Sequence, residues 1–438
     1  KFWGLGADGT VGANKNSIKI IGDNTDMYAQ AYFDYDSKKS GGVTMSHLRF
    51  GHKKIKSTYL IHQANFVACH NPAYVRKYNM VQELVDGGTF LLNCPWTHEE
   101  LDKHLPGQMK KFIADHNINF YTIDGVKIGI ETGMGPTRIN TILQSAFFKL
   151  TGIIPEEKAI DLMKAAAQKT YGRKGEDVVK KNWAAIDAGA NGVVKVEVPE
   201  SWKNAQSEDL SVKHDGEGKL IDYVNDVLVP INQFRGMQLP VSTFEAYQTG
   251  EVPLGSSAFE KRGIAIDVPV WNNETCIECG NCSYVCPHAC IRPVILTKEE
   301  LDNAPEGIRY QNAMQLDGYY YAMAISVYDC TGCGSCANVC PVNNAGKKAP
   351  ALVMTSFDDE TAKEQEKYDY LVQLAEKQEV LDKFKISTVK GSQFRKPYLE
   401  FSGACAGCGE TPYAKLATQL FGDRMFIANA TGCSSIWG

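Results

Sequence analysis

CIECGNCSYVCP at Cys276–Pro287 and CTGCGSCANVCP at Cys330–Pro341 are two copies of one cysteine pattern. In each copy three cysteines are separated by two residues each, a fourth follows after three intervening residues, and a proline comes next. The glycines Gly280, Gly332 and Gly334 permit backbone angles that a Cβ would hinder, so each copy can bend tightly. Such short spacing brings several thiolates to one ligand group.

This doubled spacing is typical of a bacterial two-cluster [4Fe–4S] module, in which the fourth cysteine of each run binds the cluster of the other run. It predicts one ligand set of Cys276, Cys279, Cys282 and Cys340, and a second of Cys330, Cys333, Cys336 and Cys286. Two neighbouring clusters transfer electrons one at a time. The alternatives are zinc, which prefers two separated pairs of ligands, and disulfides, which belong to small secreted domains. We therefore prefer the iron–sulfur interpretation.

Composition limits the class of protein. The chain has 438 residues, 44% of them hydrophobic, and a net charge of −5. The length predicts roughly two to four domains. The negative charge argues against nucleic-acid binding, and without a run of about 18 apolar residues we expect no membrane span. Lys1 lies in a glycine-rich loop and Gly438 just after a strand-like run, so we expect an internal piece of a longer polypeptide.

Residues 1–210 alternate strand-like and helix-like patterns, which predicts an α/β domain with a mainly parallel sheet. The expected elements are strands at Ser17–Gly22, Ser57–Ile61, Gly88–Asn93 and Asn119–Ile123, and a helix at Pro155–Tyr171. Residues 211–255 contain several prolines and glycines, which indicates an extended connector.

A ferredoxin-like α+β module is expected over residues 256–370. The long separation of the two cysteine runs predicts an inserted helix and hairpin over Arg292–Ile325, and the charges of Lys363–Asp382 predict an exposed helix. Residues 371–438 begin another α/β unit.

The glycine-rich start, GLGADGTVGANKNS at Gly4–Ser17, is a candidate ligand loop. Flexible backbone N–H groups together with Lys15 suit a phosphate or pyrophosphate. A tight connection between a strand and a helix is the alternative. Gly133–Asn140, which includes Arg138, is a second candidate for a polar ligand.

Three further cysteines lie near the end of the sequence. Cys405 and Cys408 form a CxxC in SGACAGCGETPY, which precedes a predicted helix with Thr411 as N-cap, Pro412 as its first residue, and Tyr413, Leu416, Ala417 and Leu420 at helical spacing. Met425–Thr431 is predicted as the next strand, with Cys433 at its carboxyl end, where open α/β sheets bind ligands. The three could hold a third cluster, while zinc or a redox dithiol remain alternatives. Cys69, Cys94 and Cys290 are expected to be buried apolar residues.

Together, GLGADGTVGANKN, the doubled cysteine motif, SGACAGCGETPY and ATGCSSIWG closely resemble the pyruvate:ferredoxin (flavodoxin) oxidoreductases, which use thiamine diphosphate. The resemblance covers essentially the whole chain, but only the middle of the much longer family sequence. It implies oxidative decarboxylation of pyruvate with coenzyme A, giving acetyl-CoA, carbon dioxide and reduced ferredoxin or flavodoxin. No catalytic residue is expected in this stretch.

The resemblance also implies four parts: a coenzyme A-binding α/β domain over residues 1–210, a connector over 211–255, a 2[4Fe–4S] ferredoxin-like domain over 256–370, and the first part of a thiamine-diphosphate domain over 371–438. The implied coenzyme A contacts are Asp8, Gly9, Thr10, Val11, Gly12, Lys39, Asn140 and Asn182. Cys405, Cys408 and Cys433 would bind a proximal cluster, and Glu410 and Cys433 would contact thiamine diphosphate, whose magnesium is bound with parts outside this chain. The pyruvate-binding domains would precede Lys1, and the fourth cluster ligand and the magnesium motif would follow Gly438.

The implied setting is a homodimer in the cytoplasm, or in an anaerobic organelle such as a hydrogenosome, because low-potential clusters need a reducing interior. Two other functions remain open. A non-catalytic electron-transfer subunit would explain residues 256–370 but not the glycine-rich loop or the last cysteines. A sister enzyme would act on another 2-oxoacid, such as 2-oxoglutarate or indolepyruvate.

Overall fold

The computed structural model describes residues 1–6, 8–36 and 41–437. The chain divides into two compact units, one reaching to Val212 and one beginning at Lys213. Each unit is built around its own sheets. In the described part of the chain, no helix is both long and apolar enough to cross a membrane.

The first unit contains one sheet of seven strands in the order β2-β3-β1-β4-β5-β6-β7. The strands are β1 (Phe2–Leu5), β2 (Tyr28–Tyr35), β3 (Val43–Gly51), β4 (Ala64–Cys69), β5 (Leu84–Asn93), β6 (Asn119–Ile123) and β7 (Val194–Lys195). β1, β4, β5 and β6 run parallel, whereas β2, β3 and β7 pair antiparallel with their neighbours. The expectation of a mainly parallel sheet is therefore wrong for its edges, where β2 and β3 form an antiparallel pair.

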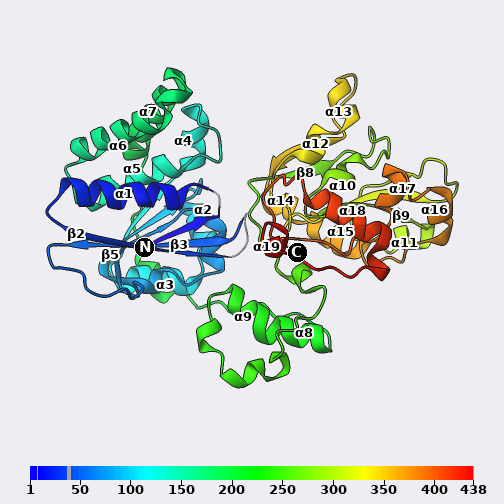
Figure 1. Cartoon of the computed structure of the whole chain (residues 1–438), viewed down its shortest axis with the longest axis horizontal. Helices are drawn as coiled ribbons and strands as arrows, with labels where there is room; N and C mark the ends of the chain where they lie inside the picture. The colour runs from blue at the N-terminus through cyan, green and yellow to red at the C-terminus, as the bar shows by residue number, and fades with distance from the viewer. Residues whose placement is uncertain (7, 37–40, 438) are drawn as a thin grey trace. The chain divides into compact units, whose positions relative to one another are not determined.

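Helices cover both faces of this sheet (Figure 1). They are α1 (Thr10–Asn24), α2 (His98–His104), α3 (Gly107–Asp115), α4 (Gly125–Glu131), α5 (Asn140–Thr151), α6 (Glu156–Tyr171) and α7 (Glu176–Asn191). Successive strand residues point to opposite faces, so Leu91 packs in the core beneath α1, α5, α6 and α7, while Phe90 and Leu92 pack in the core with α2 and α3. Two separate cores result, one on each face.

The second unit begins with short helices and then forms the ferredoxin-like part. Its first segment contains α8 (Lys219–Tyr223), a π-helical turn at Val224–Leu228 and α9 (Val229–Asn232), with Val224 and Val227 buried. The expected extended connector therefore has helical structure with buried valines.

The ferredoxin-like part has a near-twofold arrangement. β8 (Asp267–Trp271) pairs with β12 (Leu352–Ser356), and β9 (Ile291–Leu296) pairs with β11 (Tyr320–Ile325), both antiparallel. Each cysteine run ends in a short helix, α10 (Asn281–Val285) or α12 (Ser335–Asn338), and α13 (Pro341–Ala345) follows the second run. The predicted insertion between the runs is present as α11 (Lys298–Asp302) and a hairpin of β10 (Gln311–Asn312) with β11.

The remaining helices pack around this part (Figure 1). They are α14 (Asp359–Ala362), α15 (Glu364–Leu371), α16 (Gln378–Lys383), α17 (Val389–Gln393), α18 (Thr411–Phe421) and α19 (Ser434–Trp437). The single exposed helix predicted over Lys363–Asp382 is wrong, because the segment breaks between α15 and α16 and Tyr368 and Leu371 are buried in a core.

Candidate iron–sulfur and ligand-loop sites

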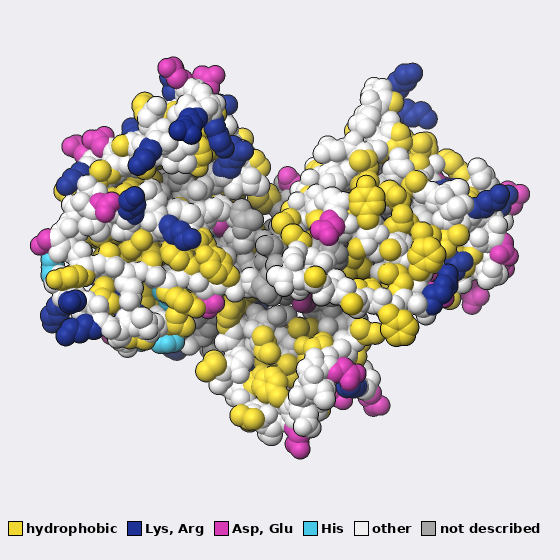
Figure 2. All heavy atoms as spheres, in the orientation of Figure 1, with side chains coloured by type: hydrophobic (Ala, Val, Ile, Leu, Met, Phe, Trp, Pro, Cys, Tyr) yellow, Lys and Arg dark blue, Asp and Glu magenta, His cyan; other side chains and the backbone are white. Residues whose placement is uncertain are grey.

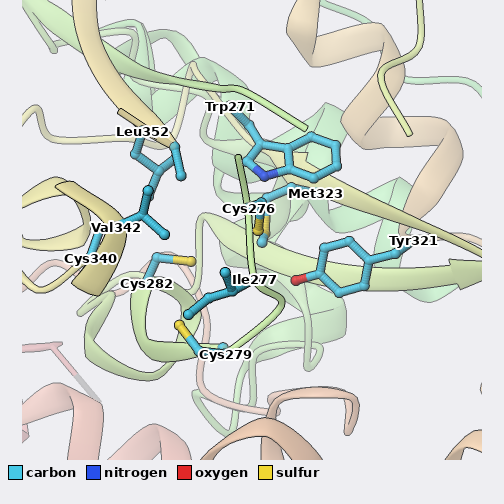
Figure 3. Close-up of a pocket in the computed structure, with 12 residues that line it drawn as sticks. Trp271, Cys276, Ile277, Cys279, Cys282, Tyr321, Met323, Cys340, Val342 and Leu352 are labelled. Atoms are coloured by element: carbon cyan, nitrogen blue, oxygen red, sulfur yellow. The ribbon is translucent and has the colours of Figure 1, made fainter. Parts of the chain in front are cut away.

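The two cysteine runs line two small apolar cavities, each with the crossed set of cysteines. Cys276, Cys279, Cys282 and Cys340 line the first, here called the Cys276 cavity, together with Trp271, Tyr321, Met323 and Leu352. Cys330, Cys333, Cys336 and Cys286 line the second, the Cys330 cavity. In Figure 3 Cys276, Cys279 and Cys282 point from one loop into the same space. Each cavity therefore offers the four sulfurs of its crossed set in a mainly apolar lining, which fits a cubane cluster, and Cys290 is a fifth cysteine that lines the Cys330 cavity.

Backbone geometry repeats between the two runs. The amide of Glu278 donates to Cys276 Sγ at 3.4 Å, and the amide of Gly332 donates to Cys330 Sγ at 3.4 Å. Both donor residues have positive φ, 54° and 67° respectively. Amide hydrogen bonds to cluster sulfurs are a general means of setting cluster potential. The structure thus presents sulfur and N–H groups as a cluster site requires.

Burial disfavours the ionised form of cysteine side chains in both cavities. Burial raises the pKa of Cys282 and of Cys330 well above the usual range, and raises the pKa of Cys336 to about 12. The exception is Cys286, whose pKa is lowered by a hydrogen bond from the Cys290 side chain and by the charge of Lys415. Buried thiols of this kind become ligands when a metal supplies the compensating positive charge.

Glu278 links the first run to the elements around it. Its buried carboxylate accepts hydrogen bonds from Gln311 Nε2 at 2.8 Å and from the Met314 amide at 3.0 Å, and it pairs with Lys390 Nζ at 3.0 Å. These contacts hold a non-glycine residue in the left-handed region, which is otherwise unfavourable. The loop around the Cys276 cavity is thereby fixed to α17 and to the insertion.

The CxxC loop lies against the second cysteine run. A Cβ at Gly407 would be 3.5 Å from Cys333 Cβ, so the loop from Cys405 to Cys408 contacts the wall of the Cys330 cavity. The Glu410 amide donates to Cys408 Sγ at 3.4 Å, which repeats the amide–sulfur geometry of the two runs. Cys405 and Cys433 are exposed.

Two expectations about the last segment are wrong. Met425–Thr431 is not a strand: Phe426 and Ile427 are exposed, and no described strand lies beside them to pair with. α18 forms as predicted, but Glu410 is its N-cap and Thr411 its first residue. Tyr413 is exposed, and the buried face is instead polar, with Thr411, Lys415, Thr418 and Gln419. In Figure 2 hydrophobic side chains are exposed over the region where α18 lies.

In the first unit the glycine-rich loop connects β1 to α1. The predicted strand at Ser17–Gly22 is wrong, because these residues continue α1. The loop therefore follows a strand and opens a helix of ordinary length, which is the context that phosphate-binding glycine motifs require. Gly9 has φ of 87° and its Cβ would lie 3.0 Å from the Asn140 side chain, so the loop contacts the start of α5.

Hydrogen bonds fix the shape of this loop. Asp8 accepts from the Leu5 and Thr10 amides at 2.9 and 2.7 Å and from Thr10 Oγ1 at 2.8 Å. Thr10 Oγ1 also lies 2.7 Å from Nδ1 of buried His70. His70 follows the end of β4, where functional residues of parallel sheets gather, although no motif in the sequence marks it.

The other residues of the predicted coenzyme A site are more scattered. Val11 is half-buried and Gly12 is exposed on the first turn of α1. Asn182 is buried in α7, where its Nδ2 donates to the Val178 carbonyl and its Oδ1 has no partner among the described residues. Lys39 lies outside the described residues. Lys15 lies over the Phe33 ring at 5.4 Å.

Comparison with known proteins is consistent with this geometry. Residues 1–192 match the family model described as pyruvate ferredoxin/flavodoxin oxidoreductase, residues 211–265 match a domain of unknown function, and residues 272–344 match a 4Fe-4S dicluster domain. The whole chain is 53% identical to a pyruvate-flavodoxin oxidoreductase of Enterobacter agglomerans and 52% identical to the pyruvate:ferredoxin oxidoreductase of Moorella thermoacetica.

Over its whole length the chain is similar to pyruvate-flavodoxin and pyruvate:ferredoxin oxidoreductases, and its first 192 residues match the model of that family. It spans 36% of the length of each of these two relatives. It is also 47% identical to a pyruvate dehydrogenase [NADP(+)] of Cryptosporidium parvum, of which it spans 23%. The names of these relatives give different electron acceptors.

The structure also identifies residues that a motif search overlooks. Lys415 is buried in α18, and burial lowers its pKa to about 8. Its Nζ donates to backbone carbonyls beside Cys286, including those of Tyr284 and Cys286 at 3.2 Å. In the sequence, these contacts are signalled only by a lysine among the polar positions on one face of α18. Cys69, Cys94 and Cys290 are buried, as expected.

Proposed function

We propose that this chain is the coenzyme A-binding and electron-transferring part of an enzyme that converts pyruvate and coenzyme A to acetyl-CoA and carbon dioxide. One proton and two electrons are released per pyruvate, and the electrons pass singly to two molecules of ferredoxin or flavodoxin. The observation that carries the proposal is the pair of cysteine-lined cavities with the CxxC loop against one of them.

Each part of the chain has a defined task in this proposal. The four cysteines of each cavity hold one cluster, and Cys405, Cys408 and Cys433 hold part of a third. The loop at Asp8–Gly12, with Asn140 beside it, binds a phosphate of coenzyme A, and Lys39 and Asn182 belong to the same site. Glu410 and Cys433 contact thiamine diphosphate. When bound, thiamine diphosphate provides the electron sink for decarboxylation and the clusters provide one-electron transfer.

The closeness of Gly407 to Cys333 supports an order for the clusters. Because the CxxC loop touches Cys333, electrons from the third cluster reach the Cys330 cavity first and the Cys276 cavity second. The lining of both cavities is mainly apolar. A reducing compartment, either the cytoplasm or an anaerobic organelle, suits clusters of low potential. The proposed assembly is a homodimer.

The test is the iron and acid-labile sulfide content of the anaerobically purified holoprotein, followed by low-temperature EPR after pyruvate and then coenzyme A are added. We expect iron for three clusters, about twelve atoms per chain, and cluster reduction that is faster when coenzyme A follows pyruvate. About eight irons without a response to pyruvate would leave only an electron-transfer module and would refute the enzymatic proposal. Reduction by 2-oxoglutarate or indolepyruvate instead of pyruvate would indicate the sister activity.

A further inference from the structure

α18 uses its polar face for packing. Its buried residues include Lys415, which is 2% exposed, whereas Tyr413 on the opposite face is 73% exposed. Amphipathic helices normally bury their apolar stripe. A buried cation on the packed face therefore requires an explanation from its surroundings.

Lys415 is held at the end of α10, the helix that leads into Cys286. Its Nζ donates to the carbonyl oxygens of Ser283, Tyr284 and Cys286. An ammonium group has three N–H donors, whereas a neutral amine has two. Three carbonyl acceptors therefore fit the charged form, and the helix C-terminus favours a cation there.

No carboxylate neutralises this cation among the described residues. The anionic or ionisable groups that act on Lys415 are, in decreasing order, Cys286 and Cys290 of the Cys330 cavity and, most weakly, Cys282 of the Cys276 cavity, and Arg292 is a further cation. Arg292 is itself paired with Glu400. A buried ammonium without a counter-ion is energetically unfavourable. The group that can balance it is the anion formed by a cluster and its four thiolates in the Cys330 cavity.

The Cys276 cavity has the opposite arrangement. The lysine near its loop, Lys390, is paired with the buried carboxylate of Glu278 at 3.0 Å. The residue that corresponds to Glu278 in the second run is Gly332, which carries no charge. The two runs are thus similar in backbone but differ in local charge.

From this asymmetry we propose that Lys415 is a positioning residue whose fixed charge raises the reduction potential of the cluster in the Cys330 cavity above that of the cluster in the Cys276 cavity. Reduction adds a negative charge to a cluster, and a nearby cation stabilises the reduced form more than the oxidised form. The inference rests on the clusters of the proposed function. Its consequence is that the cluster nearest the CxxC loop accepts electrons most readily.

The experiment is an EPR-monitored redox titration of the anaerobic holoprotein carrying Lys415→Met. We expect the midpoint potential of one cluster to become more negative while that of the other stays in place. Lys415→Arg retains the charge and should keep the wild-type potentials. Lys385→Met removes an exposed lysine of the same unit and is the matched control. Unchanged potentials in Lys415→Met, with all clusters present, would overturn the inference.

Loss of clusters would also decide the question. If Lys415→Met lacks only the cluster of the Cys330 cavity, detected as lost spin coupling between the two reduced clusters, the lysine is needed to balance that cluster's charge and the inference stands. If Lys415→Met, Lys415→Gln and Lys415→Arg all lose both clusters, the role is structural and the inference fails. A wild-type holoprotein without clusters would instead refute the proposed function.

Discussion

At the scale of single residues, Glu278 shows how a side chain outside the ligand set can determine the geometry of a ligand loop. Its backbone occupies a region that favours glycine, and its carboxylate has three donors around it. The energy of these hydrogen bonds offsets the backbone strain, which is on the order of 1 kcal/mol. The equivalent position of the second run is a glycine, which needs no such support.

Glu278→Gln should therefore destabilise the holoprotein. The variant keeps the size of the side chain, but it removes the anion that Lys390 faces and places an amide N–H₂ among donors. We expect a loss of about 1 to 3 kcal/mol, measured as a lower urea midpoint for the disappearance of cluster absorbance. Glu299→Gln, an exposed glutamate in α11, is the control and should not change that midpoint. An equal effect of both substitutions would show that the buried contacts are unimportant.

A substitution at Gly12 can distinguish an effect on folding from an effect on ligand binding in the first unit. A Cβ at Gly12 would meet nothing within 4 Å, and alanine is a better helix former than glycine by about 1 kcal/mol. Gly12→Ala should therefore leave the melting temperature unchanged or slightly raised. If coenzyme A approaches the backbone here, its affinity should fall by about tenfold, which corresponds to about 1.4 kcal/mol.

The measurement is calorimetric titration of the holoprotein with coenzyme A. Gly51→Ala is the matched control, because its Cβ also meets nothing within 4 Å and it lies in β3. Wild-type affinity in Gly12→Ala would place the ligand elsewhere and would remove the Asp8–Gly12 loop from the proposed site.

At the scale of elements, the two positive-φ glycines Gly332 and Gly318 allow backbone strain to be distinguished from crowding. Their φ values are 67° and 82°. A Cβ at Gly332 would lie 3.0 Å from the Asp267 carbonyl oxygen, whereas one at Gly318 would meet nothing within 4 Å. Each alanine variant should lose about 1 kcal/mol from the left-handed backbone.

Only Gly332→Ala should in addition disturb the Cys330 cavity, because β8 crowds the cysteine loop there. We expect the iron content per chain to fall in Gly332→Ala and to stay at the wild-type value in Gly318→Ala. Normal iron content in both variants would mean that the loop can shift away from β8 without losing its ligands.

Prediction of elements from sequence succeeded where a short segment has one dominant signal. Asn119–Ile123 forms β6 with the predicted bounds, and the helix predicted from Pro155 forms α6. The cysteine spacing predicted which residues line each cavity, because a motif of twelve residues needs little tertiary information. Local patterns were sufficient in these cases.

Prediction failed where packing decides between two local options. Ser17–Gly22 has strand-like isoleucines, but Thr10, Ala13, Ser17 and Ile21 are buried at helical spacing, and burial against the sheet outweighs the small helix penalty of β-branched residues. Ser57–Ile61 forms no strand; its Ser57 carbonyl accepts from Gln30 Nε2 and its Ile61 amide donates to a histidine ring. The role of Lys415 could not be predicted, because it depends on carbonyls about 130 residues earlier in the sequence.

At the scale of the whole first unit, buried neutral histidines should make stability depend on pH. Burial lowers the pKa of His70 to about 4, and burial followed by the charge of Lys1 lowers the pKa of His47 to about 3. Histidine in an unfolded chain has a pKa near 6.5. Protons therefore bind the unfolded state first, and the stabilisation is complete above about pH 6.5 and lost as the pH falls toward the folded-state values.

Acidification from pH 7 to pH 5 should consequently increase hydrogen exchange in β1 and β4, after correction for the intrinsic pH dependence of exchange. Each histidine contributes up to about 1.4 kcal/mol per pH unit in this window, while Asp8 beside His70 acts in the opposite direction. His70→Gln removes one titrating group and should roughly halve the pH dependence, although it also alters the bond to Thr10 and so lowers stability at pH 7. If exchange in β1 and β4 were equally protected at both pH values, the buried rings would have to accept protons without cost, which their surroundings do not allow.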